Sequence, residues 1–366
     1  MKCVTVLLIA GVFCPLFSQN QFPKNQFPKN QATPNFAHPG PAAGSMMPDF
    51  RAPDEHGNPH QLKDLLGPNG ALILFFGSAD WSPYCKGQLV ELQRNLSEIR
   101  KLGLGVAALS YDSPAVLRNF AERKGIEYPL LSDPESQVIR ETGLLNKSIP
   151  KDSSSYGIPY PGVFVVDAHG RITGKYFEQD FTRRYTAGDI LVRQFGLTPT
   201  VDAQEIKGRQ VTVTTSASAA AVSAGQRIAL VLEMSLKPNM HVYAPGVTGY
   251  IPIQWKMGGA AAWISEPPDY PKGQMLNLPA IDETVPVYEG RVRIVRDLQI
   301  GSDREVEAAK DSQGQLAISG TFRYQACDDR ICYIPQTLPL EWTLQVTPRD
   351  RTRAPAKLRR KAHASR

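Results

Sequence analysis

The hydrophobic pattern of this 366-residue chain changes once, close to residue 200. Before that point, short continuous apolar runs alternate with stretches that have apolar residues at helical spacing. After it, short segments alternate apolar and polar residues, and Gly, Pro and Asn separate them. Apolar strands between helices favour a mainly parallel sheet covered on both faces, whereas short alternating strands favour a sandwich. The pattern therefore predicts an α/β domain over residues 45–197, a linker over 198–208 and an all-β domain over 209–348.

The individual elements follow from the same periodicities. In the first domain we expect strands at 71–76, 104–109, 162–167 and 171–177, and helices behind Cys85, at 113–124 and at 183–195. In the second we expect strands at 211–215, 227–232, 254–257, 291–296, 316–324 and 338–346, and no helix. Ser113 followed by Pro114 is a favourable start for a helix, because Ser caps free N–H groups and Pro suits the first turn.

The amino terminus has the features of a secretory signal. Residues 1–18 hold a lysine, an apolar run and a small residue, Ser18, at a plausible cleavage point. Residues 19–44, with two NQFPK repeats, have little apolar surface to bury and predict a disordered tether. Cys14 as a lipoprotein cysteine, or a buried amino-terminal strand, is an alternative. Export would place the protein in the periplasm or outside the cell, where disulfide chemistry is possible.

The carboxyl terminus is basic. Residues 349–366 contain eight Lys or Arg residues and one acidic residue, whereas the whole chain has a net charge of +6, so the rest is close to neutral. Such a segment can bind nucleic acid or anionic lipid. We expect instead a solvated, disordered tail and no nucleic-acid partner. No apolar stretch reaches the length of a membrane-spanning helix.

Cys85 is the candidate nucleophile. It lies between the first predicted strand and the helix behind it, where free N–H groups and the helix dipole favour the thiolate. Lys86 adds a nearby positive charge. A buried, inert cysteine is the alternative interpretation, but the preceding loop is polar and aromatic.

The surroundings of Cys85 resemble two related families. Residues 81–85 (WSPYC) are similar to the W-C-x-x-C loop of thioredoxin-like proteins, with Ser82 in place of the first cysteine, and to the T-x-x-C loop of AhpC/TSA peroxiredoxins. Residues 128–134 (YPLLSDP) and 49–54 (DFRAPD) also resemble peroxiredoxin segments. The resemblance implies a thioredoxin-like fold with Cys85 as the reactive thiol.

Two positions depart from the peroxiredoxin pattern. Ser78 stands where these proteins usually have proline, and Pro161 stands where they have an arginine that holds the thiolate and the peroxide. Proline at that position is the thioredoxin pattern, so the resemblance makes Tyr160–Pro161 a candidate cis peptide bond facing Cys85. We include Ser82 and Pro161 among the candidate catalytic residues.

A second cysteine pair lies in the β domain. Cys327 and Cys332 flank an acidic turn and are close enough in sequence to form a disulfide, either exchangeable or purely structural. Zinc would need two more ligands, and His241 is the only histidine of this domain, so we expect no metal and no cofactor.

This part of the chain resembles the N-terminal domain of the thiol:disulfide interchange protein DsbD. Cys327, Cys332, Tyr333 and Pro335 match its C-x(n)-C-Y-x-P motif, and residues 241–245 (HVYAP) resemble an early strand and cap region. The resemblance implies an immunoglobulin-like sandwich whose cysteine pair relays electrons.

Together these features predict an exported thiol-disulfide or peroxide-linked oxidoreductase. Cys85 would attack a peroxide or a protein disulfide, the Cys327/Cys332 pair would act as a relay that resolves oxidised Cys85, and an external redox protein would supply electrons. The alternative is a non-catalytic docking protein of a periplasmic redox system. A cysteine hydrolase is disfavoured, because no histidine lies in a recognisable hydrolase signature.

Overall fold

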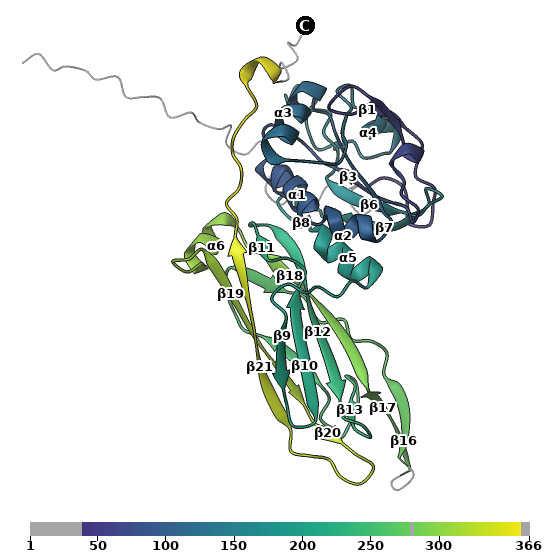
Figure 1. The fold of residues 1–366 in the computed structure, drawn as a ribbon, viewed down its shortest axis with the longest axis vertical. Helices are drawn as coiled ribbons and strands as arrows, with labels where there is room; N and C mark the ends of the chain where they lie inside the picture. Colours follow the sequence, from purple (N-terminus) through teal and green to yellow (C-terminus); the bar gives the residue numbers. More distant parts are fainter. Residues whose placement is uncertain (1–38, 279–281, 360–366) are drawn as a thin grey trace, which may run out of the picture. The chain divides into compact units, whose positions relative to one another are not determined.

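The first domain is built on a mixed five-stranded sheet (Figure 1). The structure, a computed structural model, describes residues 39–278 and 282–359. The strands lie in the order β5 (Leu130–Ser132), β4 (Gly105–Ser110), β3 (Ala71–Phe75), β6 (Gly162–Val166) and β7 (Ile172–Phe177). Strands β3, β4 and β5 are parallel, but β6 and β7 are antiparallel to their neighbours. The expectation of a mainly parallel sheet was therefore too simple, because the short turn between β6 and β7 forms a hairpin.

Helices and short strands complete this domain. They are β1 (Arg51–Pro53), β2 (Pro59–Gln61), η1 (Leu62–Leu65), α1 (Pro83–Arg94), α2 (Leu96–Lys101), α3 (Pro114–Lys124), α4 (Gln137–Glu141) and α5 (Ala187–Phe195). The helix expected behind Cys85 is two helices, α1 and α2. They meet at Asn95, whose side chain donates to the carbonyl oxygen of Glu91 at 3.0 Å, a local bond that competes with helix continuation.

The segment between β7 and α5 differs from its prediction. The expected helix over residues 183–195 begins only at Ala187, because Thr186 caps it by accepting a hydrogen bond from the backbone N–H of Asp189. Arg184 and Tyr185 form a two-residue strand, β8 (Arg184–Tyr185), that pairs with the second domain.

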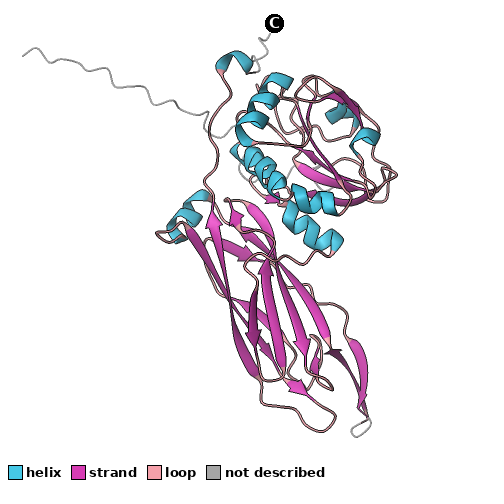
Figure 2. Ribbon diagram, in the orientation of Figure 1, coloured by secondary structure: helices cyan, strands magenta, loops and turns pink. Residues whose placement is uncertain are grey.

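The second domain is a β-sandwich, as predicted, with one short helix (Figure 2). One sheet has the order β15-β18-β12-β10-β9, the facing one β11-β21-β19-β14, and a third, at one end, β16-β17-β13-β20. The bounds are β9 (Gln204–Lys207), β10 (Val211–Ala217), β11 (Ala221–Val222), β12 (Gln226–Leu236), β13 (His241–Tyr243), β14 (Gln254–Met257), β15 (Trp263–Ser265), β16 (Gln274–Leu278), β17 (Glu283–Glu289), β18 (Arg291–Ile300), β19 (Gln315–Tyr324), β20 (Ala326–Cys327) and β21 (Gln336–Val346). Helix α6 (Asp303–Ala309) was missed, although Ser302 and Glu305 form a capping box at its start.

Strand β12 has two apolar faces. Ile228, Leu230 and Leu232 enter the sandwich core with Trp255 and Trp342. On the other face, Ala229 and Val231 pack against Val192 of α5 in the first domain. Alternation of side chains across the strand explains how one strand serves both contacts.

The boundary segments are more ordered than the sequence suggested. Residues 204–207 of the expected linker form β9 of the sandwich. At the end of the expected tether, Gly44 donates its N–H to the carbonyl oxygen of Ile172. The expected signal segment and residues 19–38 lie outside the described residues. Across the described ranges, none of the helices has the length and apolar character that a membrane crossing requires.

Candidate redox site

Cys85 is the third residue of α1, as the sequence predicted. Ser82 caps the helix by accepting a hydrogen bond from the backbone N–H of Cys85 at 3.3 Å, and Pro83 occupies the first helical position. The Cys85 side chain is 2 % exposed. Ser82 therefore fixes the backbone of Cys85.

Two N–H groups point at the sulfur of Cys85. The backbone N–H of Gly77, which follows β3, donates to Sγ at 3.3 Å, and Nη2 of Arg184 lies 3.9 Å from it. Donors and a positive charge directed at sulfur stabilise the thiolate relative to the thiol. Both donors come from segments outside α1, so the fold brings them to the Cys85 sulfur.

Lys86 links two backbone segments near the start of α1. Its ammonium group donates to the carbonyl oxygens of Asp80 at 3.2 Å and Thr352 at 2.9 Å, and its side chain is fully buried. Burial lowers its pKa to about 8. Lys86 thus holds the loop before α1 to the carboxyl-terminal segment.

A buried carboxyl group supports the loop before Cys85. Asp112 accepts hydrogen bonds from the Ser78 hydroxyl at 2.9 Å and from the backbone N–H of Ala79 at 2.6 Å. Burial raises its pKa to about 7, although these hydrogen bonds oppose the shift. The hydroxyl of Ser78 explains why serine suits the position where peroxiredoxins usually have proline.

Pro161 does not form the expected cis bond. No peptide bond in the described residues is cis. Pro159 forms a β-bridge with Leu145, and β6 begins at the residue after Pro161. The extended backbone on both sides of the Tyr160–Pro161 bond continues without a turn, so a cis bond is not needed there.

The described part of the basic tail is not a free end. Arg353 forms an ion pair with Asp80, and the backbone N–H of Ala354 also donates to Asp80. Burial would raise the pKa of Asp80, but these hydrogen bonds lower it below its usual value. The disordered tail was therefore a wrong prediction for residues 349–359, because its charges find partners in the folded domains.

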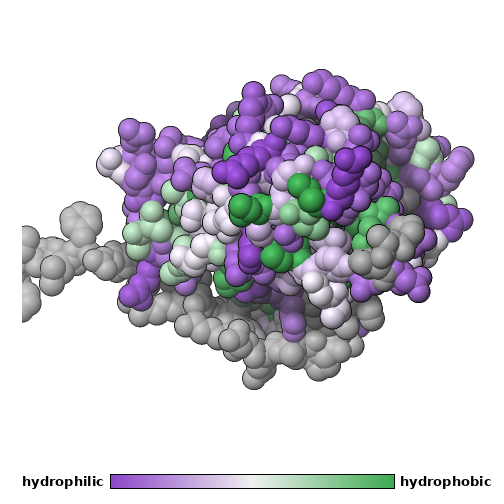
Figure 3. All heavy atoms as spheres, turned by 90° about the horizontal axis from the view of Figure 1, so that it is seen from below, coloured by the Kyte–Doolittle hydropathy of each residue, from purple (hydrophilic) through white to green (hydrophobic). Residues whose placement is uncertain are grey.

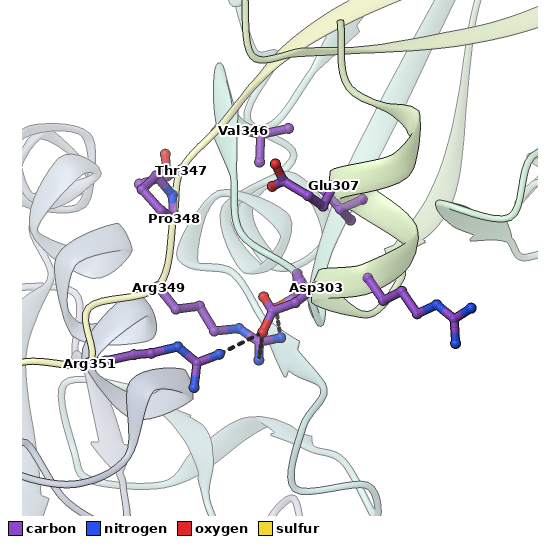
Figure 4. Close-up of a pocket in the computed structure, with 10 residues that line it drawn as sticks. Asp303, Glu307, Val346, Thr347, Pro348, Arg349 and Arg351 are labelled. Carbon is purple, nitrogen blue, oxygen red and sulfur yellow. Dashed lines mark hydrogen bonds and ion pairs between the residues drawn. The ribbon is translucent and has the colours of Figure 1, made fainter. Parts of the chain in front are cut away.

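The first residues of this segment cover the start of α1. The Arg349 guanidinium lies 3.8 Å from the ring centre of Tyr84, the neighbour of Cys85. Arg349 and Arg351 also pair with Asp303 of α6, where they line a pocket with Glu307 (Figure 4). We name residues 349–354 the carboxyl-terminal strap.

The second cysteine pair is bridged in the structure. Cys327 and Cys332 form a disulfide in which Cys327 is 1 % exposed and Cys332 is exposed. The Tyr243 hydroxyl lies 3.8 Å from the Cys332 sulfur. His241 pairs with Cys327 across the strands, and burial lowers its pKa below the usual value. An attacking thiolate would therefore meet the sulfur of Cys332 first.

Three exposed apolar side chains lie on the loop of Cys332 or on the sheet that this loop adjoins. Ile331 and Ile334 lie in the same loop as Cys332, and Met275 lies on β16 of the same sheet as β20. Ile334 is 79 % exposed. Figure 3 views the end of the β domain that holds this sheet and shows hydrophobic residues among hydrophilic ones.

The two cysteine centres adjoin opposite ends of β12. Arg184, beside Cys85, pairs with Gln226 at the first residue of β12. Cys327 pairs with His241, shortly after β12 ends at Leu236. An eleven-residue strand is about 33 Å long, so the centres cannot exchange directly in this arrangement. The structure thus does not bring together Cys85 and the pair expected to resolve it.

Arg184 is the functional candidate that the sequence analysis missed. The sequence analysis included it in the helix expected over 183–195 and gave it no role. Thr186 three residues before Asp189 is a recognisable cap, and it would have ended the helix before Arg184. Among the described residues, no group of three or more His, Cys, Asp or Glu side chains could hold a metal ion.

Comparison with known proteins finds relatives for the domain that holds Cys85. Residues 43–175 match the AhpC/TSA family. Peroxiredoxin Bcp of Escherichia coli K12 is 34 % identical over 134 residues, which cover 36 % of this chain and 81 % of that protein. The chain belongs to the AhpC/TSA family. A second AhpC/TSA-region relative, thiol-disulfide oxidoreductase ResA of Geobacillus thermodenitrificans, is 28 % identical over 38 % of this chain and 74 % of its own length.

The β domain matches separately. Residues 209–341 match the N-terminal domain of thiol:disulfide interchange protein DsbD. Among solved structures, peroxidoxin BcpB of Mycobacterium tuberculosis aligns with 38 % of this AhpC/TSA chain and 86 % of its own at 24 % identity, with a TM-score of 0.35. The relatives of the AhpC/TSA domain support a redox oxidoreductase.

Proposed function

We propose that this chain is an exported thiol oxidoreductase whose nucleophile is Cys85. The observation that carries the proposal is the pair of N–H donors, from Gly77 and Arg184, directed at a cysteine sulfur in the first turn of a helix. They would stabilise the thiolate that attacks a peroxide or a protein disulfide.

With a peroxide, the thiolate attacks one oxygen, the O–O bond breaks, and the leaving alkoxide or hydroxide takes a proton. Cys85 becomes a sulfenic acid, which condenses with a thiol and releases water. With a protein disulfide, the attack gives a mixed disulfide and releases one thiolate. Both routes need a second thiol, and a separate redox protein is the proposed donor.

The Cys327/Cys332 disulfide is proposed as a second redox centre with its own external partner. The exposed Cys332 sulfur and the apolar side chains of Ile331 and Ile334 support exchange with another protein rather than with Cys85 of the same chain. Export is consistent with the amino-terminal sequence, which lies outside the described residues.

Turnover of hydrogen peroxide and of a protein disulfide, with dithiothreitol as reductant, tests the proposal. Wild type should consume at least one substrate, and a Cys327→Ser/Cys332→Ser double variant should keep the activity of Cys85. Cys85→Ser in that double-variant background should consume neither substrate. A wild type that consumes neither substrate, and whose Cys85 alkylates no faster than a free cysteine at neutral pH, would favour the docking-protein alternative.

A further inference from the structure

Arg184 is a buried cation without a carboxylate partner. It is 5 % exposed, and in the described part of the chain no acidic side chain lies within ion-pair distance of it. Nη1 donates to the carbonyl oxygen of Arg183, and Nη2 approaches the Cys85 sulfur at 3.9 Å. A buried guanidinium is costly unless an anion compensates it, and a thiolate at Cys85 would be such an anion within reach.

The first domain alone does not fix the backbone of Arg184. Strand β8 has only two residues, and its ladder pairs with β12 of the β-sandwich. From the first domain, the Gln88 side chain donates to the carbonyl oxygen of Tyr185 at 3.4 Å. Arg184 donates its N–H to the carbonyl oxygen of Gly225 at 2.8 Å, and Thr186 donates its N–H and its hydroxyl to that of Arg227 at 3.2 and 2.8 Å. Strand β10 pairs with β12 only from Leu230 onward, which leaves the start of β12 open to β8.

Gly225 permits this pairing. Its φ angle is +80°, and a Cβ atom added there would overlap the carbonyl oxygen of Thr182, two residues before Arg184. A side chain at position 225 would therefore displace the segment that carries Arg184. Gly188 is a second close approach, because a Cβ atom there would overlap the carbonyl oxygen of Ser218.

We propose that the β-sandwich is a structural part of the Cys85 site, because the pairing of β12 with β8 places the Arg184 guanidinium against the Cys85 sulfur. The inference rests on the proposed role of Cys85 as nucleophile. In this arrangement Arg184 touches the reacting atom, and Gly225 acts only through the position of Arg184. The second domain thus anchors an arginine that contacts Cys85. Position 161, where peroxiredoxins have an arginine, holds a proline.

The test measures the rate of Cys85 alkylation by iodoacetamide between pH 5 and 10, in the full chain with its disulfide intact. Arg184→Gln should react about tenfold more slowly at neutral pH, because a positive charge near the sulfur is lost, and Arg184→Lys should recover part of the rate. Gly225→Ala should be slower with the same displacement of the pH profile. Gly249→Ala is the matched control, since Gly249 has φ +84° and an added Cβ atom would meet nothing within 4 Å.

A double variant shows whether Gly225→Ala slows alkylation by displacing Arg184 or by disturbing the fold in general. Gly225→Ala combined with Arg184→Gln should react like Arg184→Gln alone. The inference is wrong if Gly225→Ala slows alkylation equally with and without Arg184, or leaves it unchanged. If Gly225→Ala does not fold, Gly188→Ala disturbs the same docking at another point and must give the same pattern. Normal turnover in Arg184→Gln would overturn this inference and leave the proposed function standing. Absent turnover in wild type would overturn the proposed function, and the alkylation rates would then show separately whether β12 positions Arg184.

Discussion

Ser82 and Ser113 cap α1 and α3, and comparing them shows whether the cap beside Cys85 does more than stabilise its helix. Each precedes a proline, and each accepts a hydrogen bond from the backbone N–H three residues later. Replacing either by alanine should lower the free energy of unfolding by about 1 kcal/mol. Only Ser82→Ala should also slow alkylation of Cys85, since its partner is the Cys85 N–H. Urea unfolding and alkylation rates of both variants check this, and equal alkylation would contradict it.

The unequal exposure of the disulfide sulfurs predicts the order in which the two thiols react. After mild reduction, limiting iodoacetamide should modify Cys332 before Cys327, because Cys332 is exposed and Cys327 is buried. Peptide mass spectrometry of samples taken over time measures the two rates. The single variants Cys327→Ser and Cys332→Ser serve as controls for each thiol alone. Equal rates would place the point of exchange elsewhere.

Glu91 shows how single residues connect elements. It is fully buried in α1 and accepts hydrogen bonds from the N–H groups of Ala187 and Gly188, at the start of α5. Burial raises its pKa to about 7, although these hydrogen bonds oppose the shift. Between about pH 4.5 and 7 the folded protein therefore holds a proton that the unfolded chain has lost.

This proton makes the free energy of unfolding fall as pH rises through that range, by up to about 1.4 kcal/mol per pH unit. Glu91→Gln should reduce the slope, whereas Glu98→Gln on the exposed side of α2 should leave it unchanged. Urea unfolding at several pH values measures it. Asp112 contributes a slope of the same sign, so the difference between variants isolates Glu91. An unchanged slope in Glu91→Gln would show that this carboxyl group is ionised in the folded protein.

The sequence predicted elements well where burial alone decides them. Strands β3 and β6 are buried at every position, and β4 is buried at every position but its first, because both faces of the sheet are covered. It failed for β8, whose two residues become a strand only by pairing with β12, some forty positions away. It failed also for the expected cis bond at Pro161, since the resemblance supplied that expectation and the local backbone continues in extended form. The local sequence indicates which residues are buried, but it does not indicate which strands pair with each other.

At the scale of the whole molecule, the carboxyl-terminal strap gives a further prediction. Deleting residues 349–366 removes the Thr352 carbonyl from Lys86 and the ion pair from Asp80. The deletion should lower the free energy of unfolding by about 1–3 kcal/mol, because buried polar groups lose their partners. It should also expose Lys86, and its pKa should rise towards its ordinary value.

Acetylation with limiting acetic anhydride, followed by peptide mass spectrometry, measures this exposure. Lys86 should be protected in the full chain and modified in the deletion variant. Lys101, whose side chain is 70 % exposed, should be modified in both and so controls for reagent concentration. Protection of Lys86 after the deletion would show that the strap is not what covers it.

The strap has a consequence for the order of biosynthesis. Asp80 and Arg353 are 273 positions apart, so the ribosome makes the entire β-sandwich between one partner and the other. The first domain can begin folding as it emerges, but the loop before Cys85 waits for its last hydrogen bonds until the sandwich has also been made. A chain released early, before residue 349, would carry Cys85 and both folded domains yet lack its cover. Completion of the thiol's surroundings is therefore coupled to synthesis of the strap, and chains that end before the strap are distinguishable by chemistry at a single loop.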